Sequence, residues 1–130
     1  MDKTIIVIIA IIILGGFLFW GFQSDFFSGL SINPGKVIAP DGIILFYGDG
    51  CPHCENVEDF ISENNIEDKM AFSRLEVWNN EDNQVILAQD IKKCGMNADE
   101  VGIPFLFDGV DKCYMGDEDV INYFKTKAGI

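Results

Sequence analysis

The sequence is organised around one stretch, residues 43–54, which reads IILFYGDGCPHC and carries an apolar run directly into two cysteines. Residues 43–47 are all apolar or aromatic, a pattern typical of a strand that is buried on both faces of a sheet. Gly48-Asp49-Gly50 interrupts this run. Apolar residues three and four positions apart then predict a helix from about Cys54 to Asn64. The two cysteines therefore lie where a buried strand gives way to a helix.

That position favours redox chemistry at Cys51 and Cys54. Cys51 falls at the helix N-terminus, where unpaired N–H groups and the helix dipole favour an anion, so we expect a stabilised, reactive thiolate. Pro52 has the backbone angle that a first helical turn requires. The two-residue spacing lets Cys54 close a disulfide with Cys51 or resolve a mixed disulfide. His53 adds positive charge near Cys51, which favours the thiolate and a more oxidising disulfide.

Two other functions remain open for the Cys-x-x-Cys pair. Because this spacing also forms half of many zinc sites, a metal or iron–sulfur binding module using Cys51, His53 and Cys54 is one alternative. The other is an adhesion or scaffold domain in which all four cysteines form structural disulfides. The strand–motif–helix context favours a thiol–disulfide oxidoreductase, with no metal and no cofactor.

Strand and helix signals alternate along the rest of the chain. In chain order we expect a strand at 43–47, a helix at 54–64, a strand at 70–78, a helix from Asn79 or Asn80 to Gly95, strands at 105–107 and 113–115, and a final helix capped by Asp117 that buries Val120, Ile121 and Phe124. The order is β-α-β-α-β-β-α. The first two strands should be parallel and the last two should form a hairpin, which gives an α/β fold with a mixed four-stranded sheet and flanking helices.

The motif and this order of elements resemble the thioredoxin superfamily over about residues 43–127. Residues 46–54 are similar to the active-site segment of that family, and Gly102-Ile103-Pro104 is similar to the loop that holds its cis-proline opposite the dithiol. The strand order is closest to the minimal, glutaredoxin-sized version of the fold. The Pro-His dipeptide is similar to that of the bacterial extracytoplasmic oxidases that introduce disulfides, although the inserted helical domain of the large oxidases is missing.

The resemblance implies roles for individual residues. Cys51 would be the nucleophile and Cys54 the resolving thiol. Pro104 would shape a substrate groove in which the backbone of Ile103 pairs with an extended peptide. Leu45 occupies the position where thioredoxins carry a buried acid that assists proton transfer, so that role is unassigned in this chain.

Cys94 and Cys113 form a second candidate pair. The second predicted helix and the third predicted strand both end at the sheet edge away from Cys51, so these two cysteines should be neighbours remote from the dithiol. We favour a structural disulfide, which would close a loop of about 20 residues and contribute roughly 3 kcal/mol. Two free buried thiols, a relay pair for electrons from Cys54 and a four-cysteine metal site are the alternatives, in falling order.

Residues 4–22 carry no charge and predict a transmembrane helix of about 28 Å, close to the ~30 Å apolar core of a bilayer. The run is long and ends in aromatic residues without a small-residue cleavage site, which favours an uncleaved anchor over a signal peptide. Lys3 precedes the run and the next basic residue is Lys36, so we expect a cytoplasmic N-terminus and an extracytoplasmic domain. The predicted parts are an anchor at 1–22, a linker at 23–42 and a thioredoxin-like domain at 43–130.

The formal net charge of −12 falls entirely on the part after the anchor, because Asp2 and Lys3 cancel. Such a surface repels nucleic acid and anionic lipid headgroups, which excludes nucleic-acid binding as a main role. The expected partners are protein thiols and disulfides in the extracytoplasmic space, together with a membrane redox partner that resets the dithiol. The Pro52-His53 pair favours an oxidase or isomerase, while the substrates and the direction of electron flow stay open.

Overall fold

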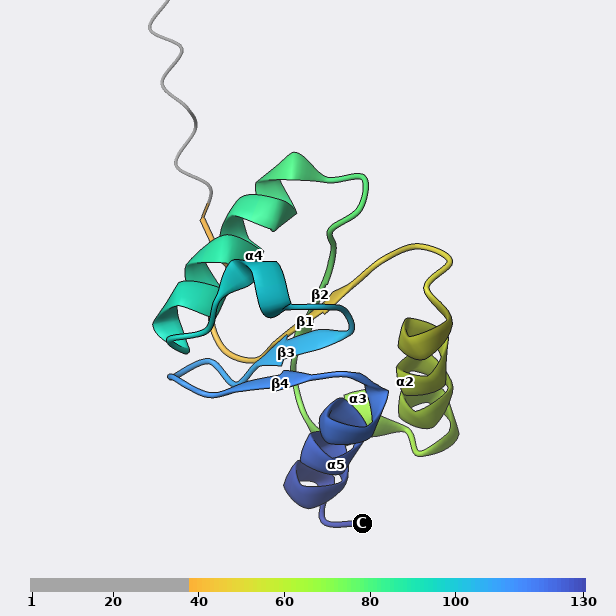
Figure 1. The fold of residues 1–130 in the computed structure, drawn as a ribbon. Helices are drawn as coiled ribbons and strands as arrows, with labels where there is room; N and C mark the ends of the chain where they lie inside the picture. The colour runs from red at the N-terminus through yellow and green to blue at the C-terminus, as the bar shows by residue number, and fades with distance from the viewer. Residues whose placement is uncertain (1–37) are drawn as a thin grey trace, which may run out of the picture. The chain divides into compact units, whose positions relative to one another are not determined.

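The apolar run before the two cysteines forms β1 (Ile44–Tyr47), an inner strand of a four-stranded sheet, in a computed structural model that describes residues 38–130 (Figure 1). The strand order is β2-β1-β3-β4. β2 (Ser73–Glu76) runs parallel to β1, whereas β3 (Phe105–Phe107) is antiparallel to both β1 and β4 (Cys113–Met115). The predicted mixed sheet is confirmed.

Helices cover both faces of the sheet, which explains why β1 and β3 are apolar at every position (Figure 1). One face packs on α2 (Pro52–Glu63), α3 (Ile66–Lys69) and α5 (Asp117–Ala128), and the other packs on α4 (Glu81–Lys93). Alternate side chains enter the two cores. The buried residues on the α2, α3 and α5 side are Leu45, Val57, Ile61, Ile66, Leu106, Val120, Tyr123 and Phe124. Those on the α4 side are Ile44, Phe46, Val77, Ile86, Ile91, Phe105 and Phe107.

The predicted element order β-α-β-α-β-β-α is confirmed, with helices on both faces of the sheet. β3 and β4 begin and end at the predicted residues. Asn80 is the N-cap of α4, where its side chain accepts a hydrogen bond from the Asn83 N–H at 3.1 Å. Two short elements were not predicted, α3 and the 3₁₀ turn η1 (Ala98–Glu100).

The second strand is shorter than its pattern suggested. Residues 70–72 precede β2 and residues 77–78 follow it, so the strand is confined to Ser73–Glu76. Phe72 packs its ring against Phe124 of α5, with 5.0 Å between the ring centroids. The apolar residues at the start of this segment therefore serve the core without forming part of the strand.

Asp117 was expected to cap the last helix, and this expectation is wrong. Gly116, with φ at +86°, is the N-cap, and Asp117 is the first residue of α5. Its carboxylate instead receives hydrogen bonds from α2. On the same helix Val120 and Phe124 are buried as predicted, whereas Ile121 is half-buried. Tyr123 is more buried than Ile121, and its ring centroid lies 4.7 Å from that of Tyr114, with the two rings tilted.

The predicted transmembrane helix at 4–22 and most of the predicted linker lie outside the described residues. Within residues 38–130, no helix is both long enough and apolar enough to cross a bilayer.

Candidate active site

Cys51 caps helix α2, in the position that the strand-to-helix switch predicts. Its backbone is extended, with φ at −81° and ψ at 115°, and Pro52 follows as the first helical residue. The Cys51 carbonyl accepts from the N–H groups of Cys54 and Glu55, both at 3.0 Å. The Cys51 Sγ also accepts from the Cys54 N–H at 3.3 Å. The sulfur thus sits against the N–H groups of the first helical turn, where a negative charge is favoured.

Both cysteines of the motif are free thiols, and both are buried, with 5% of Cys51 and 4% of Cys54 exposed. Burial raises the pKa of Cys54 to about 12, and the hydrogen bond and charge of Cys51 act in the same direction. A thiol with that pKa keeps its proton at neutral pH. Cys54 therefore becomes a nucleophile only when a neighbouring group takes its proton.

A pocket of about 160 Å³ opens beside the dithiol. Its wall is made by the end of β1, the loop after it and the first two turns of α2, namely Tyr47, Gly48, Asp49, Gly50, Cys51, Cys54, Glu55 and Glu58. The carboxylates of Asp49 and Glu55 are exposed, whereas Glu58 is half-buried and forms an ion pair with Arg74 of β2 at 3.0 Å. The approach to the thiols is therefore acidic.

His53 points to the last helix. Its side chain is 70% exposed, and Nδ1 lies 3.1 Å from Oδ2 of Asp117. The same carboxylate oxygen accepts from Nδ2 of Asn56 at 2.7 Å. Hydrogen bonds from Asn56 and His53 lower the pKa of Asp117 to about 2. We expected His53 to place a positive charge near Cys51, and the Asp117 carboxylate beside it would offset that charge. The sequence pattern did not predict this contact between His53 and Asp117.

The loop before β3 brings Ile103 and Pro104 to the dithiol end of the sheet. The bond between them is a cis peptide. Phe105 pairs with Phe46, so Pro104 lies next to the end of β1 that leads into Cys51. The Pro104 carbonyl accepts from the Gly116 N–H at 2.9 Å, and the Gly102 N–H donates to the sulfur of Met115 at 3.1 Å. No backbone hydrogen bond within residues 38–130 involves Ile103, so its peptide groups are free to pair with another chain.

Trp78 is a site residue that the sequence pattern did not single out. A Cβ added at Gly48 would overlap the Trp78 ring and come within 2.7 Å of Cδ1 of Ile103, so the ring packs on the active-site loop and beside the cis-proline loop. The side chain is nevertheless 53% exposed. It therefore offers an apolar surface next to the dithiol.

Glu76 ties the Trp78 loop to the active-site loop, and it too was missed. Its carboxylate accepts from the backbone N–H groups of Trp78 at 2.8 Å, Asn79 at 2.9 Å and Asp49 at 3.5 Å. Partial burial opposes the charge, but these three donors together hold the pKa of Glu76 below its ordinary value. The sequence signal that could have indicated this turn is an acidic residue, Glu76, three positions before the Asn79-Asn80 pair at the end of a predicted strand.

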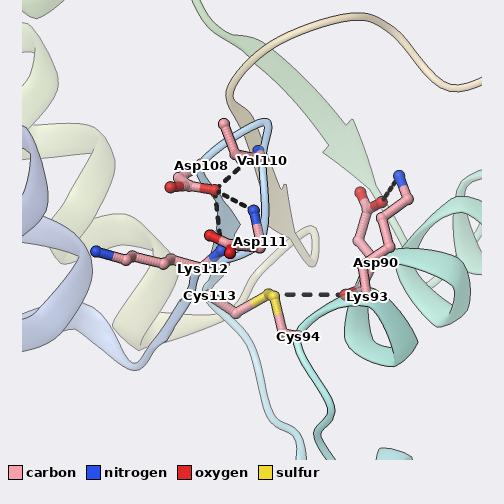
Figure 2. Close-up of a disulfide and its surroundings, with 8 residues drawn as sticks. All are labelled: Asp90, Lys93, Cys94, Asp108, Val110, Asp111, Lys112 and Cys113. Atoms are coloured by element: carbon pink, nitrogen blue, oxygen red, sulfur yellow. Dashed lines mark hydrogen bonds and ion pairs between the residues drawn. A yellow bond between two sulfur atoms is a disulfide. The ribbon is translucent and has the colours of Figure 1, made fainter.

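The second cysteine pair forms a disulfide between the end of α4 and the start of β4 (Figure 2). The Cα atoms of Cys94 and Cys113 are 6.0 Å apart, and the Cys113 sulfur lies 3.8 Å from the backbone oxygen of Asp90. Cys113 pairs with Phe107, which in turn pairs with Ile44 at the start of β1. The disulfide therefore lies at the end of the sheet opposite Cys51, and the structure does not bring the two cysteine pairs together.

The turn between β3 and β4 stands beside this disulfide (Figure 2). The carboxylate of Asp108 accepts three backbone hydrogen bonds, from Val110 at 2.9 Å and from Asp111 and Lys112 at 3.0 Å each. Partial burial acts the other way, yet these donors hold the pKa of Asp108 below its ordinary value. These three hydrogen bonds hold the turn in one conformation, which fixes the start of β4 and therefore the position of Cys113.

In the described part of the chain, no group of three or more His, Cys, Asp or Glu side chains is placed to hold a metal ion. No protein-family model and no curated protein matches the sequence. Among solved structures, a crystal structure of wheat glutaredoxin is similar to this chain, with 18% sequence identity, a TM-score of 0.48, and coverage of 72% of this chain and 81% of that one.

Proposed function

We propose that this protein is a membrane-anchored thiol–disulfide oxidoreductase that exchanges disulfides with extracytoplasmic proteins through Cys51 and Cys54. The observation that carries the proposal is the placement of Cys51, whose sulfur accepts an N–H from the first turn of α2 in a pocket open to substrate. A thiolate there is stabilised by the helix N-terminus and attacks a substrate disulfide. Cys54 then attacks the mixed disulfide and releases the substrate.

The surroundings of the dithiol support a polypeptide substrate. The unpaired backbone of Ile103 and the exposed ring of Trp78 flank the loop that carries Cys51. An extended segment can add backbone hydrogen bonds at the first and bury an apolar side chain on the second. The disulfide between Cys94 and Cys113 supports an oxidising location, because such bonds persist outside the cytoplasm.

The orientation and the partner are part of the same proposal. The apolar run at 4–22 would anchor the chain with its N-terminus in the cytoplasm. A membrane redox protein would then reset the dithiol after each turnover. The Pro-His pair favours oxidation or isomerisation of substrates over their reduction.

Serine variants of the two cysteines test the assignment. Cys51→Ser should abolish reaction with a disulfide substrate, because the attacking sulfur is gone. Cys54→Ser should accumulate mixed disulfides, visible on non-reducing gels and removed by dithiothreitol. The matched control is the double variant Cys94→Ser, Cys113→Ser, which should exchange at the wild-type rate. Trapping by Cys51→Ser in place of Cys54→Ser would reverse the two roles, and no reaction with the wild-type protein would overturn the proposal.

A further inference from the structure

The proton of Cys54 must leave before this thiol can resolve a mixed disulfide, and the strand below it offers no acceptor. Leu45 occupies the position on β1 where thioredoxins carry a buried acid, and it lies in the apolar core. Burial holds the pKa of Cys54 far above neutrality. The attacking species is the thiolate, so the rate of resolution depends on a base within reach.

Glu58 is the half-buried carboxylate of the pocket that Cys54 also lines. It follows Cys54 by four residues on α2, and side chains with that spacing lie on one face of a helix, about 5–6 Å apart at Cβ. Burial raises the pKa of Glu58, with the ion pair to Arg74 acting against it. Burial is the main cause of the raised pKa of Cys54, and the negative charge of Glu58 adds to it.

The charged and titratable groups around Glu58 come from several elements. They are Tyr47 at the end of β1, Asp49 from the loop after it, Cys51 at the N-cap of α2, Cys54 and Glu55 from α2, Glu67 from α3 and Arg74 from β2. Arg74 holds Glu58 with one nitrogen at 3.0 Å and Glu67 with another at 2.9 Å. Asp49 and Glu55 are exposed, so their carboxylates are solvated and their interactions with the thiols are screened by water. Glu58 alone combines partial burial with a position one turn from Cys54.

We propose that Glu58 is the proton acceptor of Cys54 in the resolving step, an inference that rests on the proposed function. The Glu58 carboxylate takes the thiol proton across the shared pocket. The Cys54 sulfur then attacks the Cys51 sulfur, the Cys51–Cys54 bond forms, and the bond from Cys51 to the substrate sulfur breaks. The substrate leaves as a thiolate, so the enzyme dithiol is oxidised by two electrons and the substrate disulfide is reduced. In the reverse direction the protonated Glu58 returns the proton to Cys54 as that sulfur departs.

A two-phase reaction separates this inference from the function it rests on. The full-length protein in detergent, with its dithiol reduced, is mixed rapidly with 5,5′-dithiobis(2-nitrobenzoate). Attack by Cys51 releases one coloured thiolate, and attack by Cys54 on the mixed disulfide releases a second. In Glu58→Gln the second phase should slow by about 100-fold, the scale of general base catalysis, while the first phase is not slowed, because loss of a negative charge only eases the approach of this anionic disulfide. Glu58→Asp, which retains a carboxylate, should recover most of the second phase.

Two control variants make the result specific. Asp59→Asn and Glu63→Gln each remove an exposed carboxylate of α2 that does not line the pocket. Both should resolve at the wild-type rate, and all variants are compared for their unfolding midpoint. A charge effect without proton transfer predicts the opposite sign, because loss of the Glu58 charge makes the Cys54 thiolate easier to form. A second phase in Glu58→Gln that is unchanged or faster overturns the inference, whereas the absence of a first phase in the wild-type protein overturns the proposed function.

Discussion

At the scale of single residues, His53 has a neighbour that changes what its charge can do. Its Nδ1 lies 3.1 Å from the carboxylate of Asp117, and that carboxylate also binds Asn56. The Asp117 carboxylate places a negative charge beside the imidazole, and this charge offsets part of the positive field that His53 can exert on Cys51. The influence of His53 on the dithiol is therefore the difference between two effects.

His53→Ala should make the Cys51–Cys54 couple less oxidising. The variant lacks a positive neighbour of the thiolate, so the reduced form loses stability relative to the disulfide. One pKa unit of thiolate stabilisation corresponds to ~30 mV for a two-electron couple, and the shift should reach at most about that size because Asp117 shares the charge. Equilibration with glutathione buffers measures the potential, and Asn56→Ala serves as the control. A potential within the measurement error of wild type would make His53 a bystander.

Asp117 should stabilise the fold in a pH-dependent way. Its pKa falls from the ordinary 3.8 to about 2 in the folded chain, so folding favours the ionised form. The stabilisation is fully present above about pH 4 and is lost as the pH falls toward 2. Asp117→Asn should therefore unfold at a lower temperature than wild type at pH 7, and the two curves should converge between pH 4 and 2. A constant difference over that range would show that the charge of Asp117 is not the cause.

At the scale of elements, local signals predicted those parts of the fold that neighbouring residues determine. Pro104 and the Asp108-Gly109 turn delimit β3 and β4, so both strands begin and end where the sequence predicted. The strand-to-helix switch likewise placed Cys51 at the start of α2.

Contacts between residues far apart in the chain were out of reach of those signals. The Trp78 ring packs on Gly48, thirty positions earlier, and Asp117 binds His53 from sixty-four positions away. An Asp before an apolar run looks like a helix cap from sequence alone, and only the packing of α5 against α2 gives it a different partner. The contact of Phe72 with Phe124 of α5 is also long-range, so the sequence pattern did not predict it.

The disulfide between α4 and β4 should stabilise the domain. It joins residues 19 positions apart, and restricting an unfolded loop of that length is worth roughly 3 kcal/mol. The double variant Cys94→Ser, Cys113→Ser should lose about that much free energy of unfolding in urea, measured on the fully reduced dithiol. Cys51→Ser provides the comparison, because it replaces a buried sulfur but breaks no bond, whereas Cys94 and Cys113 are half-buried. Equal losses in the two variants would mean that the effect is packing and not the cross-link.

At the scale of the whole molecule, the net charge of −12 should make the rate of reaction with a small disulfide depend on the charge of that disulfide. The pocket wall adds Asp49, Glu55 and Glu58 close to the thiols. We expect cystamine, which is cationic, to react faster than neutral 2-hydroxyethyl disulfide, and oxidised glutathione, which is anionic, to react slowest. Each rate is divided by the rate of the same disulfide with free 2-mercaptoethanol, which removes differences in intrinsic reactivity.

Salt separates charge from shape in that series. The Debye length falls from about 30 Å at 0.01 M to about 3 Å at 1 M, so the spread between cationic and anionic disulfides should shrink as salt is added. If the three disulfides keep the same relative rates in 1 M salt, the differences between them come from how each fits the pocket and not from charge.

The covalent link between Cys94 and Cys113 also has a consequence for how each molecule is made. A newly synthesised chain carries four thiols, and the described structure holds two thiols and one disulfide. Closing that bond removes two electrons and two protons, so each copy must meet an electron acceptor before it is mature. A protein that we propose to exchange disulfides with other proteins must therefore first be oxidised itself. Chains produced without an oxidant should form a separate population, two mass units heavier than the mature one.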